Sequence, residues 1–182
     1  MPRAAKAPSA RTDLAAGIAL VALTPVADPH TRMQVWLDDA DTDVDAAGDD
    51  AIAAVRRCDE VLQMAIGLEF AGIAMKGRLL RAHALCRAGH ADAAALAMRE
   101  LLPQFAMVQP ADLYFGRAWW LAAQVFEVSG DGDQALMALA QGAQWVRRVA
   151  LPNVPEEFRE SFLQRNPTNR ALLAAADRRL AQ

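Results

Sequence analysis

Three histidines, His30, His83 and His90, are the side chains of this 182-residue sequence best suited to moving protons near neutral pH. No serine or cysteine is paired with them in the manner of an activated nucleophile, and the sequence lacks GxSxG, HExxH, GxGxxG and Walker-type patterns. His90 falls in a predicted turn, where helix capping would account for it, whereas His83 is either a groove residue or a core histidine. We therefore expect a protein that is not an enzyme and uses no cofactor.

The two cysteines do not form a metal-binding or disulfide pattern. Cys58 and Cys86 lie inside apolar helical patterns, without CxxC or Cys/His spacing. Isolated cysteines in such patterns are usually buried thiols that do not react. They predict a reducing, cytoplasmic location.

Acidic residues concentrate in segment 38–50, where oxygen ligands for calcium could gather. Residues 39–43 read Asp-x-Asp-x-Asp, as at the start of a calcium loop. However, Val44 stands where that loop needs glycine, and Asp50 replaces its bidentate glutamate. We expect no bound metal, and a solvated acidic segment instead.

The elements that position these residues are predicted to be helices. Alanine makes up more than a fifth of the chain, 54% of the residues are hydrophobic, and isoleucine occurs four times, which favours helix over sheet. The formal charge is −3 with a pI near 5.6, so direct nucleic-acid binding is not expected. The sequence predicts an all-α fold.

An internal repeat organises the chain. Residues Ala88–Leu96 match Ser129–Met137 at an offset of about 41, and Ala47–Ala53 is a fainter third copy. In each copy a glycine ends one helical stretch, and an aspartate two or three residues later could cap the next. This pattern predicts antiparallel helical hairpins stacked as a short α-solenoid of about 8–9 helices.

We expect helix boundaries at glycines, prolines and capping residues. Asp28 and Asn166 precede prolines and should cap helices, while Pro103 should kink or shorten one. We predict a disordered tail over 1–10 and a single domain over 11–182, with its clearest repeats at 69–109 and 110–150 and C-terminal capping helices over 155–181. The predicted helices cover 12–23, 29 to between 38 and 46, 49–66, 69–88, 91–106, 111–129, 131–150, 156–165 and the residues from 167 onward.

The N-terminus allows two interpretations. Basic residues precede an apolar run over 14–23, which loosely matches a signal peptide, so residues 1–27 would be removed on export. Alternatively, Leu14, Ile18 and Val21 form the stripe of an ordinary helix. We favour the helix, because no clean cleavage site follows. The run is too short to cross a membrane.

The two clear copies resemble tetratricopeptide repeats. The resemblance rests on small residues in each first helix, large residues three positions later, turn glycines, and small residues in each second helix. These pairs are Ala82 and Ala123, Leu85 and Phe126, Gly89 and Gly130, and Ala94 and Ala135. The string Val154–Leu173 is similar to the segment that closes such arrays in large bacterial signalling ATPases and transcriptional activators. The resemblance implies a protein-interaction module in bacterial signal transduction or transcription regulation.

Helical repeats of this kind bind partners on the concave face formed by their first helices. By repeat alignment, that face would carry Lys76, Leu79, His83, Arg87, Arg117, Trp120, Gln124 and Glu127. It would suit an acidic or amphipathic peptide, with Trp120 as an apolar anchor unless this ring belongs to the core. The alternative is a small-molecule sensor that uses the same groove.

Further interactions could involve a second copy of the chain. Arginines give the C-terminal third a basic character, suited to an acidic neighbour such as segment 38–50 of another copy. These are Arg147, Arg148, Arg159, Arg165, Arg170, Arg178 and Arg179. A homodimer is therefore one of the expected assemblies, whereas a membrane partner is not.

Overall fold

The computed structural model describes residues 28–43, 49–108, 110 and 113–180, and this part of the chain is all-α, as predicted. Its eight α-helices are α2 (Pro29–Asp43), α3 (Asp49–Gly67), α4 (Ala71–Arg87), α5 (Ala91–Leu101), α6 (Phe115–Val128), α7 (Gly132–Trp145), α8 (Glu156–Gln164) and α9 (Pro167–Leu180). The predicted tail over 1–10 and helix over 12–23 lie outside the described residues. The predicted helix ranges otherwise agree with these bounds to within a few residues.

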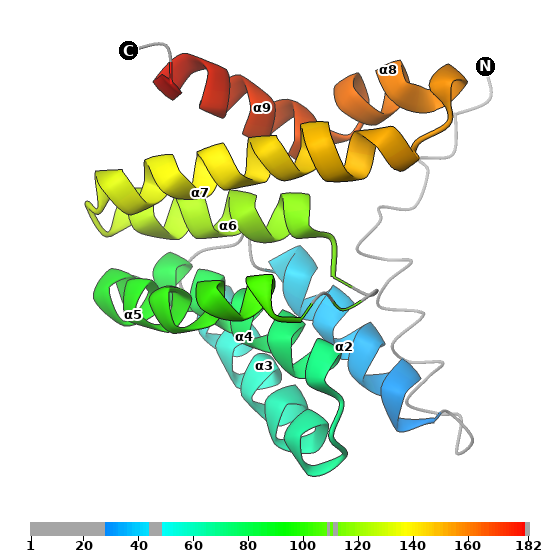
Figure 1. Cartoon of the computed structure of the whole chain (residues 1–182). Helices are drawn as coiled ribbons and strands as arrows, with labels where there is room; N and C mark the ends of the chain where they lie inside the picture. The colour runs from blue at the N-terminus through cyan, green and yellow to red at the C-terminus, as the bar shows by residue number, and fades with distance from the viewer. Residues whose placement is uncertain (1–27, 44–48, 109, 111–112, 181–182) are drawn as a thin grey trace, which may run out of the picture.

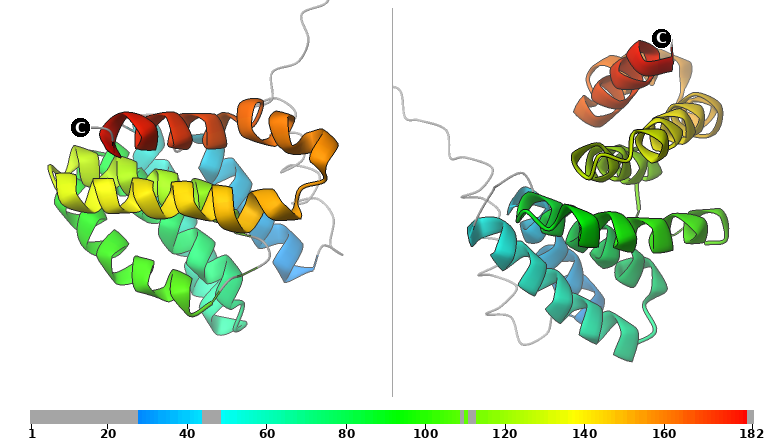
Figure 2. Two further views of the ribbon diagram at one scale, coloured as in Figure 1. Left: turned by 45° about the horizontal axis from the view of Figure 1, so that its top comes forward. Right: turned by 90° about the vertical axis from the view of Figure 1, so that its left-hand side faces the viewer.

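The helices pack in the order in which they follow along the chain. Helix α4 contacts α2, α3, α5 and α6, and α6 in turn contacts α7 and α9 (Figure 1). Helix α9 lies along α7 at the opposite end from α2 and α3 (Figure 2). A hydrophobic core runs through these contacts from Met33 on α2 to Ala176 on α9. This order brings α5 and α7 to the same side of α6.

Three of the turns between helices share one hydrogen-bond pattern. The amides of Phe70, His90 and Asp131 each donate to the carbonyl five residues earlier, at 2.9 Å in every case. This is the bond that closes a helix in a Schellman turn. The residue before each donor has a left-handed φ, +88° at Gly89 and +79° at Gly130, as the repeat predicts.

The helix caps agree in part with the prediction. Asp28 accepts the Thr31 amide at 3.0 Å, and Asn166 accepts the Asn169 amide at 3.1 Å, so both predicted caps are confirmed. At α7 the cap is Asp131, directly after the turn glycine, rather than an aspartate two or three residues later. His90 occupies the same position before α5 but forms no side-chain cap bond, so the predicted capping role is wrong.

Two helices end in turns of a different winding. Helix α5 stops at Leu101, and residues Leu102–Ala106 continue as a 3₁₀-helix, η1. Pro103 lacks the amide hydrogen that an α-helix needs at this position, so the predicted shortening is confirmed. Helix α7 passes into a π-helical turn, η2 (Val146–Ala150), and then a short 3₁₀ turn, η3 (Leu151–Asn153). Both ends lie beside the site described next.

Buried thiols and one buried amide complete the core. Cys58 and Cys86 are both buried thiols outside any disulfide, as predicted, and burial raises the pKa of the Cys86 thiol despite the nearby Arg87. The Asn169 side chain is fully buried; its Nδ2 donates to the Phe162 carbonyl at 2.9 Å, and its Oδ1 accepts from the Tyr114 hydroxyl. Asn169 thereby joins the starts of α6 and α9 to the end of α8.

Candidate functional site

A groove of about 700 Å³ separates the second helices of the two clear repeats. Helix α5 with η1 forms one wall, α7 with η2 forms the other, and α6 forms the floor. We call it the α5–α7 groove. It is lined by Arg99, Leu102, Pro103, Phe105, Ala106, Phe115, Trp119, Gln134, Met137, Gln141, Gln144, Trp145 and Val149. Its surface is mainly apolar, and its volume exceeds that of each of the other cavities described below.

Four aromatic rings from three segments form the centre of the α5–α7 groove. Phe105 of η1 meets Phe115 edge-on at 5.3 Å between ring centres, and Trp119 edge-on at 5.4 Å. Trp145 of α7 lies 6.0 Å from Phe115 at a tilt of 44°. Edge-to-face contacts of this length stabilise ring positions. The apolar surface is therefore held in place by the fold before any partner binds.

The preceding repeat has the corresponding groove, but a larger share of its lining side chains is polar. Between α3 and α5 lies a cavity of about 490 Å³. Arg78 and Gln104 line it, 41 residues before Trp119 and Trp145, and the Arg78 Nη1 donates to the Gln104 Oε1 at 3.3 Å. One groove is thus crossed by a hydrogen bond, whereas its copy carries two indole rings at the same repeat positions.

Gly142 allows a close approach between helices beside Trp119. A Cβ atom at Gly142 would lie 2.7 Å from the Cβ of Trp119 and 3.0 Å from both methyl groups of Leu172. The corresponding residue of the preceding repeat is Leu101. The missing side chain lets α7 approach both α6 and α9 closely at this point.

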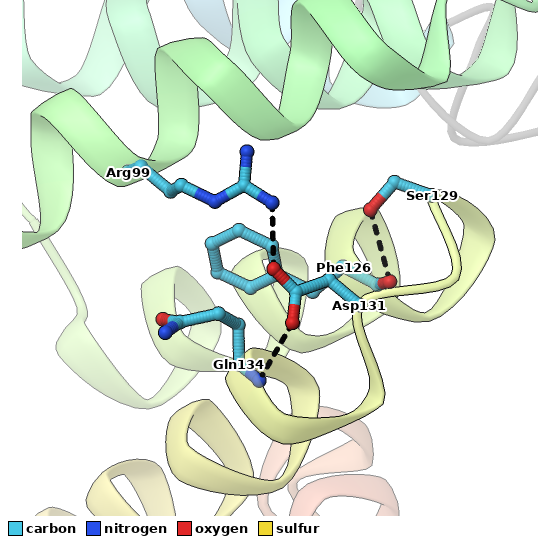
Figure 3. A network of polar contacts seen from close by, with 5 residues as sticks. All are labelled: Arg99, Phe126, Ser129, Asp131 and Gln134. Atoms are coloured by element: carbon cyan, nitrogen blue, oxygen red, sulfur yellow. Dashed lines mark hydrogen bonds and ion pairs between the residues drawn. The ribbon is translucent and has the colours of Figure 1, made fainter.

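The charge of the groove is balanced at its wall. Arg99 of α5 donates through Nη2 to the Oδ2 of Asp131 at 2.6 Å, while the backbone N–H of Gln134 donates to Oδ1 at 3.2 Å (Figure 3). The arginine and this amide hold the pKa of Asp131 below its ordinary value. The Arg99 guanidinium also lies 5.7 Å from the ring centre of Phe126. Arg99 is the only charged residue among the lining residues, and its charge is matched by Asp131.

Three amide side chains give the groove hydrogen-bonding capacity. Gln134, Gln141 and Gln144 project from one side of α7, with Met137 between the first two. No side-chain hydrogen bond of these three glutamines occurs within the part of the chain that the structure describes. Each amide offers a donor and an acceptor to whatever occupies the groove.

The concave-face residues predicted from the repeat lie elsewhere, on α4 and α6. Lys76, Leu79 and Arg117 line a cavity of about 150 Å³ between these helices. Lys76 donates to the Asp38 Oδ1 at 2.7 Å and to the Gln34 Oε1 at 3.2 Å, both on α2. The first half of the predicted face is therefore occupied in part by contacts within the molecule.

The second half of the predicted face meets α9. Trp120, Gln124 and Glu127 line a cavity of about 210 Å³ together with Arg178 and Arg179. Glu127 accepts a hydrogen bond from Arg179 in an ion pair. Trp120 is half-buried and packs against the core, so the ring is neither fully exposed nor wholly internal.

Two predicted residues are too buried to meet a partner directly. Leu79 is 2% exposed and His83 is 3% exposed, so both belong to the core, and Arg87 is exposed at the end of α4. The structure thus divides the eight residues among the core, two small cavities and the surface, and does not gather them in one site.

Among the described residues, no group of three or more His, Cys, Asp or Glu side chains could hold a metal ion. The side chains of Asp39, Asp41 and Asp43 lie outside that description. The described helices also include none with the length and apolar character needed to cross a membrane.

Comparisons with protein families, curated proteins and solved structures give no match to this chain. The candidate site therefore rests on its geometry. The sequence did not predict the α5–α7 groove, because the resemblance to tetratricopeptide repeats places the binding face on the first helices of the repeats. The available signal was the change from Arg78 to Trp119 and from Gln104 to Trp145 at the repeat offset.

Proposed function

We propose that this chain is a non-catalytic protein-interaction module that binds a peptide segment of its partner in the α5–α7 groove. One observation supports this proposal most strongly. The groove presents two partly exposed indole rings, Trp119 and Trp145, packed on the buried Phe105 and Phe115, where the preceding repeat has hydrogen-bonded polar side chains. Rings arranged around a cavity are the usual anchor sites of protein interfaces.

The physical basis of binding would be burial of apolar surface in a preformed pocket. Removing apolar surface from water favours association by about 25 cal/mol of free energy per Å². Rings that are already held in place lose little rotamer freedom on binding. The glutamine amides on α7 would provide direction through hydrogen bonds to the partner. The aromatic rings would select the shape of the partner's apolar side chain, and the glutamines of α7 would set the orientation of the bound segment.

The concave face remains a second contact surface in this proposal. Arg117, Trp120 and Gln124 are half-buried there and can add contacts after the α5–α7 groove is filled. We prefer the α5–α7 groove as the main binding site because Lys76 and Glu127 of the concave face already form ion pairs with α2 and α9.

The resemblance to tetratricopeptide repeats supports the biological setting of the proposal. Together with the similarity of the C-terminal string, it favours a bacterial signalling or transcription-regulating system, and a cytoplasmic module within it. The stacking of α2–α3, α4–α5 and α6–α7 as a short solenoid belongs to the same proposal, supported by the contacts of α4 with α2 and α6.

A matched pair of substitutions tests the groove. Met137 lines it and is 44% exposed, while Leu96, 41 residues earlier, is 57% exposed and does not line it. Peptides selected from a random displayed library on the folded chain should bind Met137→Arg at least about tenfold more weakly, by isothermal titration calorimetry, because a buried guanidinium loses hydration. Leu96→Arg should bind as the wild type does. Selection of no peptide, or equal binding by both variants, would refute the proposal.

The volume of the groove also supports a small-molecule sensor as a second candidate. Cavities that hold small ligands measure about 300–1,000 Å³, and this one measures about 700 Å³. A ligand present at 100 times its dissociation constant should stabilise the wild type by about 2.7 kcal/mol in a thermal-shift screen, and Met137→Arg should remove the shift. A screen without any shift would exclude this candidate.

A further inference from the structure

A smaller, basic cavity adjoins one end of the α5–α7 groove. It measures about 250 Å³ and is lined by Ala140, Ala143, Gln144, Arg147, Arg148 and Leu180. Gln144 lines both cavities, so they meet at this side chain. A partner that leaves the groove along α7 would reach the two arginines.

The charge at this second cavity is not balanced within the described part of the molecule. Arg147 pairs with Asp177 of α9 at 2.7 Å. Arg148 is exposed and forms no ion pair or hydrogen bond with any residue that the structure describes. One positive charge therefore remains at this end, whereas Asp131 matches Arg99 inside the α5–α7 groove.

We infer that the peptide bound by this chain carries a bulky apolar residue and, close to it in sequence, a carboxylate. The inference rests on the proposed function and specifies its partner. The apolar side chain fills the space between Trp119 and Trp145, where the lining has no net charge. The carboxylate meets Arg148, the unmatched cation beyond Gln144. Gln144, which lines both cavities, binds the peptide backbone between these two points.

The helix geometry sets the spacing of the two partner residues. Trp145 and Arg148 are three positions apart, which is about 4.5 Å along an α-helix at 1.5 Å per residue. Arg148 lies in the π-helical turn that follows α7. An extended peptide advances about 3.3 Å per residue. With the reach of an arginine side chain, the carboxylate lies one to three residues from the apolar anchor.

The experiment uses the full chain and peptides selected on it from a random displayed library. We expect the selected sequences to be enriched in an aromatic or large aliphatic residue with Asp or Glu within three positions. Arg148→Glu should weaken their binding about five- to tenfold in calorimetry. Arg56 is also exposed but lies on α3 and lines neither cavity, so Arg56→Glu should leave binding unchanged. Replacing the peptide carboxylate by its amide should remove the effect of Arg148→Glu.

The possible failures are distinguishable. If selected peptides bind Met137→Arg as well as they bind the wild type, the groove is not the site, and both the inference and the proposed function fail. If Met137→Arg abolishes binding but Arg148→Glu does not weaken it, or the selected peptides lack acidic residues, only the carboxylate inference fails. Circular dichroism spectra matching the wild type ensure that each variant is folded.

Discussion

At the scale of single residues, the wall of the groove depends on the close approach of helices at Gly142. The position that corresponds to Gly142 in the preceding repeat is Leu101, so the second repeat has lost a side chain here. A Cβ atom at position 142 would lie 2.7 Å from the Cβ of Trp119 and 3.0 Å from both methyl groups of Leu172. A close-packed interior has no room for such an added group unless its neighbours shift.

A glycine-to-alanine comparison tests this close packing. Gly142→Ala should lower the free energy of unfolding by about 1–2 kcal/mol, since an overpacked core loses more than the better helix propensity of alanine returns. Gly132→Ala is the control, because a Cβ there meets no atom within 4 Å. It should be neutral or slightly stabilising. Urea denaturation followed by circular dichroism measures both, and equal stabilities would contradict the packing argument.

At the scale of elements, the turns decide where each helix ends. Gly89 and Gly130 occupy left-handed positions in two turns, but the α3–α4 turn places Glu69 there, with a φ of +59°. The backbone bonds are the same in all three turns. A residue with a Cβ atom is strained in this conformation, by about 1 kcal/mol.

Substitutions at the turns should therefore change stability in opposite directions. Glu69→Gly should raise the free energy of unfolding by about 0.5–1 kcal/mol, whereas Gly89→Ala should lower it by about 1 kcal/mol. Position 89 has open space around its Cα, so the loss at that site reports the backbone alone. Chemical denaturation measures both variants. A destabilising Glu69→Gly would show that the left-handed turn carries no strain.

The sequence contains most of the information about these elements and little about the groove. Glycines, prolines and capping residues act locally, so the helix ranges, the cap at Asp28 and the shortening at Pro103 could be predicted. The α3–α4 turn has no glycine in its left-handed position, so its type could not. The groove depends on how far α5 stands from α7, which follows from the packing of distant rings. No local pattern encodes that separation.

At the scale of the whole molecule, a buried amide connects the C-terminal helices to the rest. Asn169 accepts from Tyr114 at the start of α6 and donates to Phe162 at the end of α8. Burial of these polar groups is favourable only while each has its partner. The attachment of α8 and α9 to the repeats therefore includes one specific polar connection as well as apolar packing.

Removing this amide should loosen one end of the molecule. Asn169→Ala should lower the free energy of unfolding by about 1–3 kcal/mol, because the Tyr114 hydroxyl and the Phe162 carbonyl lose their partner. Hydrogen exchange should accelerate in α8 and α9 more than in α3 and α4. Gln164→Ala, at an exposed amide of α8, is the control. A uniform acceleration across all helices would mean that Asn169 does not act locally.

The position of the indole rings has a spectroscopic consequence. The chain has four tryptophans, and two of them, Trp119 and Trp145, line the α5–α7 groove. Half of the tryptophans therefore line the space that an occupant would fill, while Trp36 lies on α2, away from it. Emission at long excitation wavelengths consequently reports on occupancy without any attached dye, and the protein serves as its own optical probe.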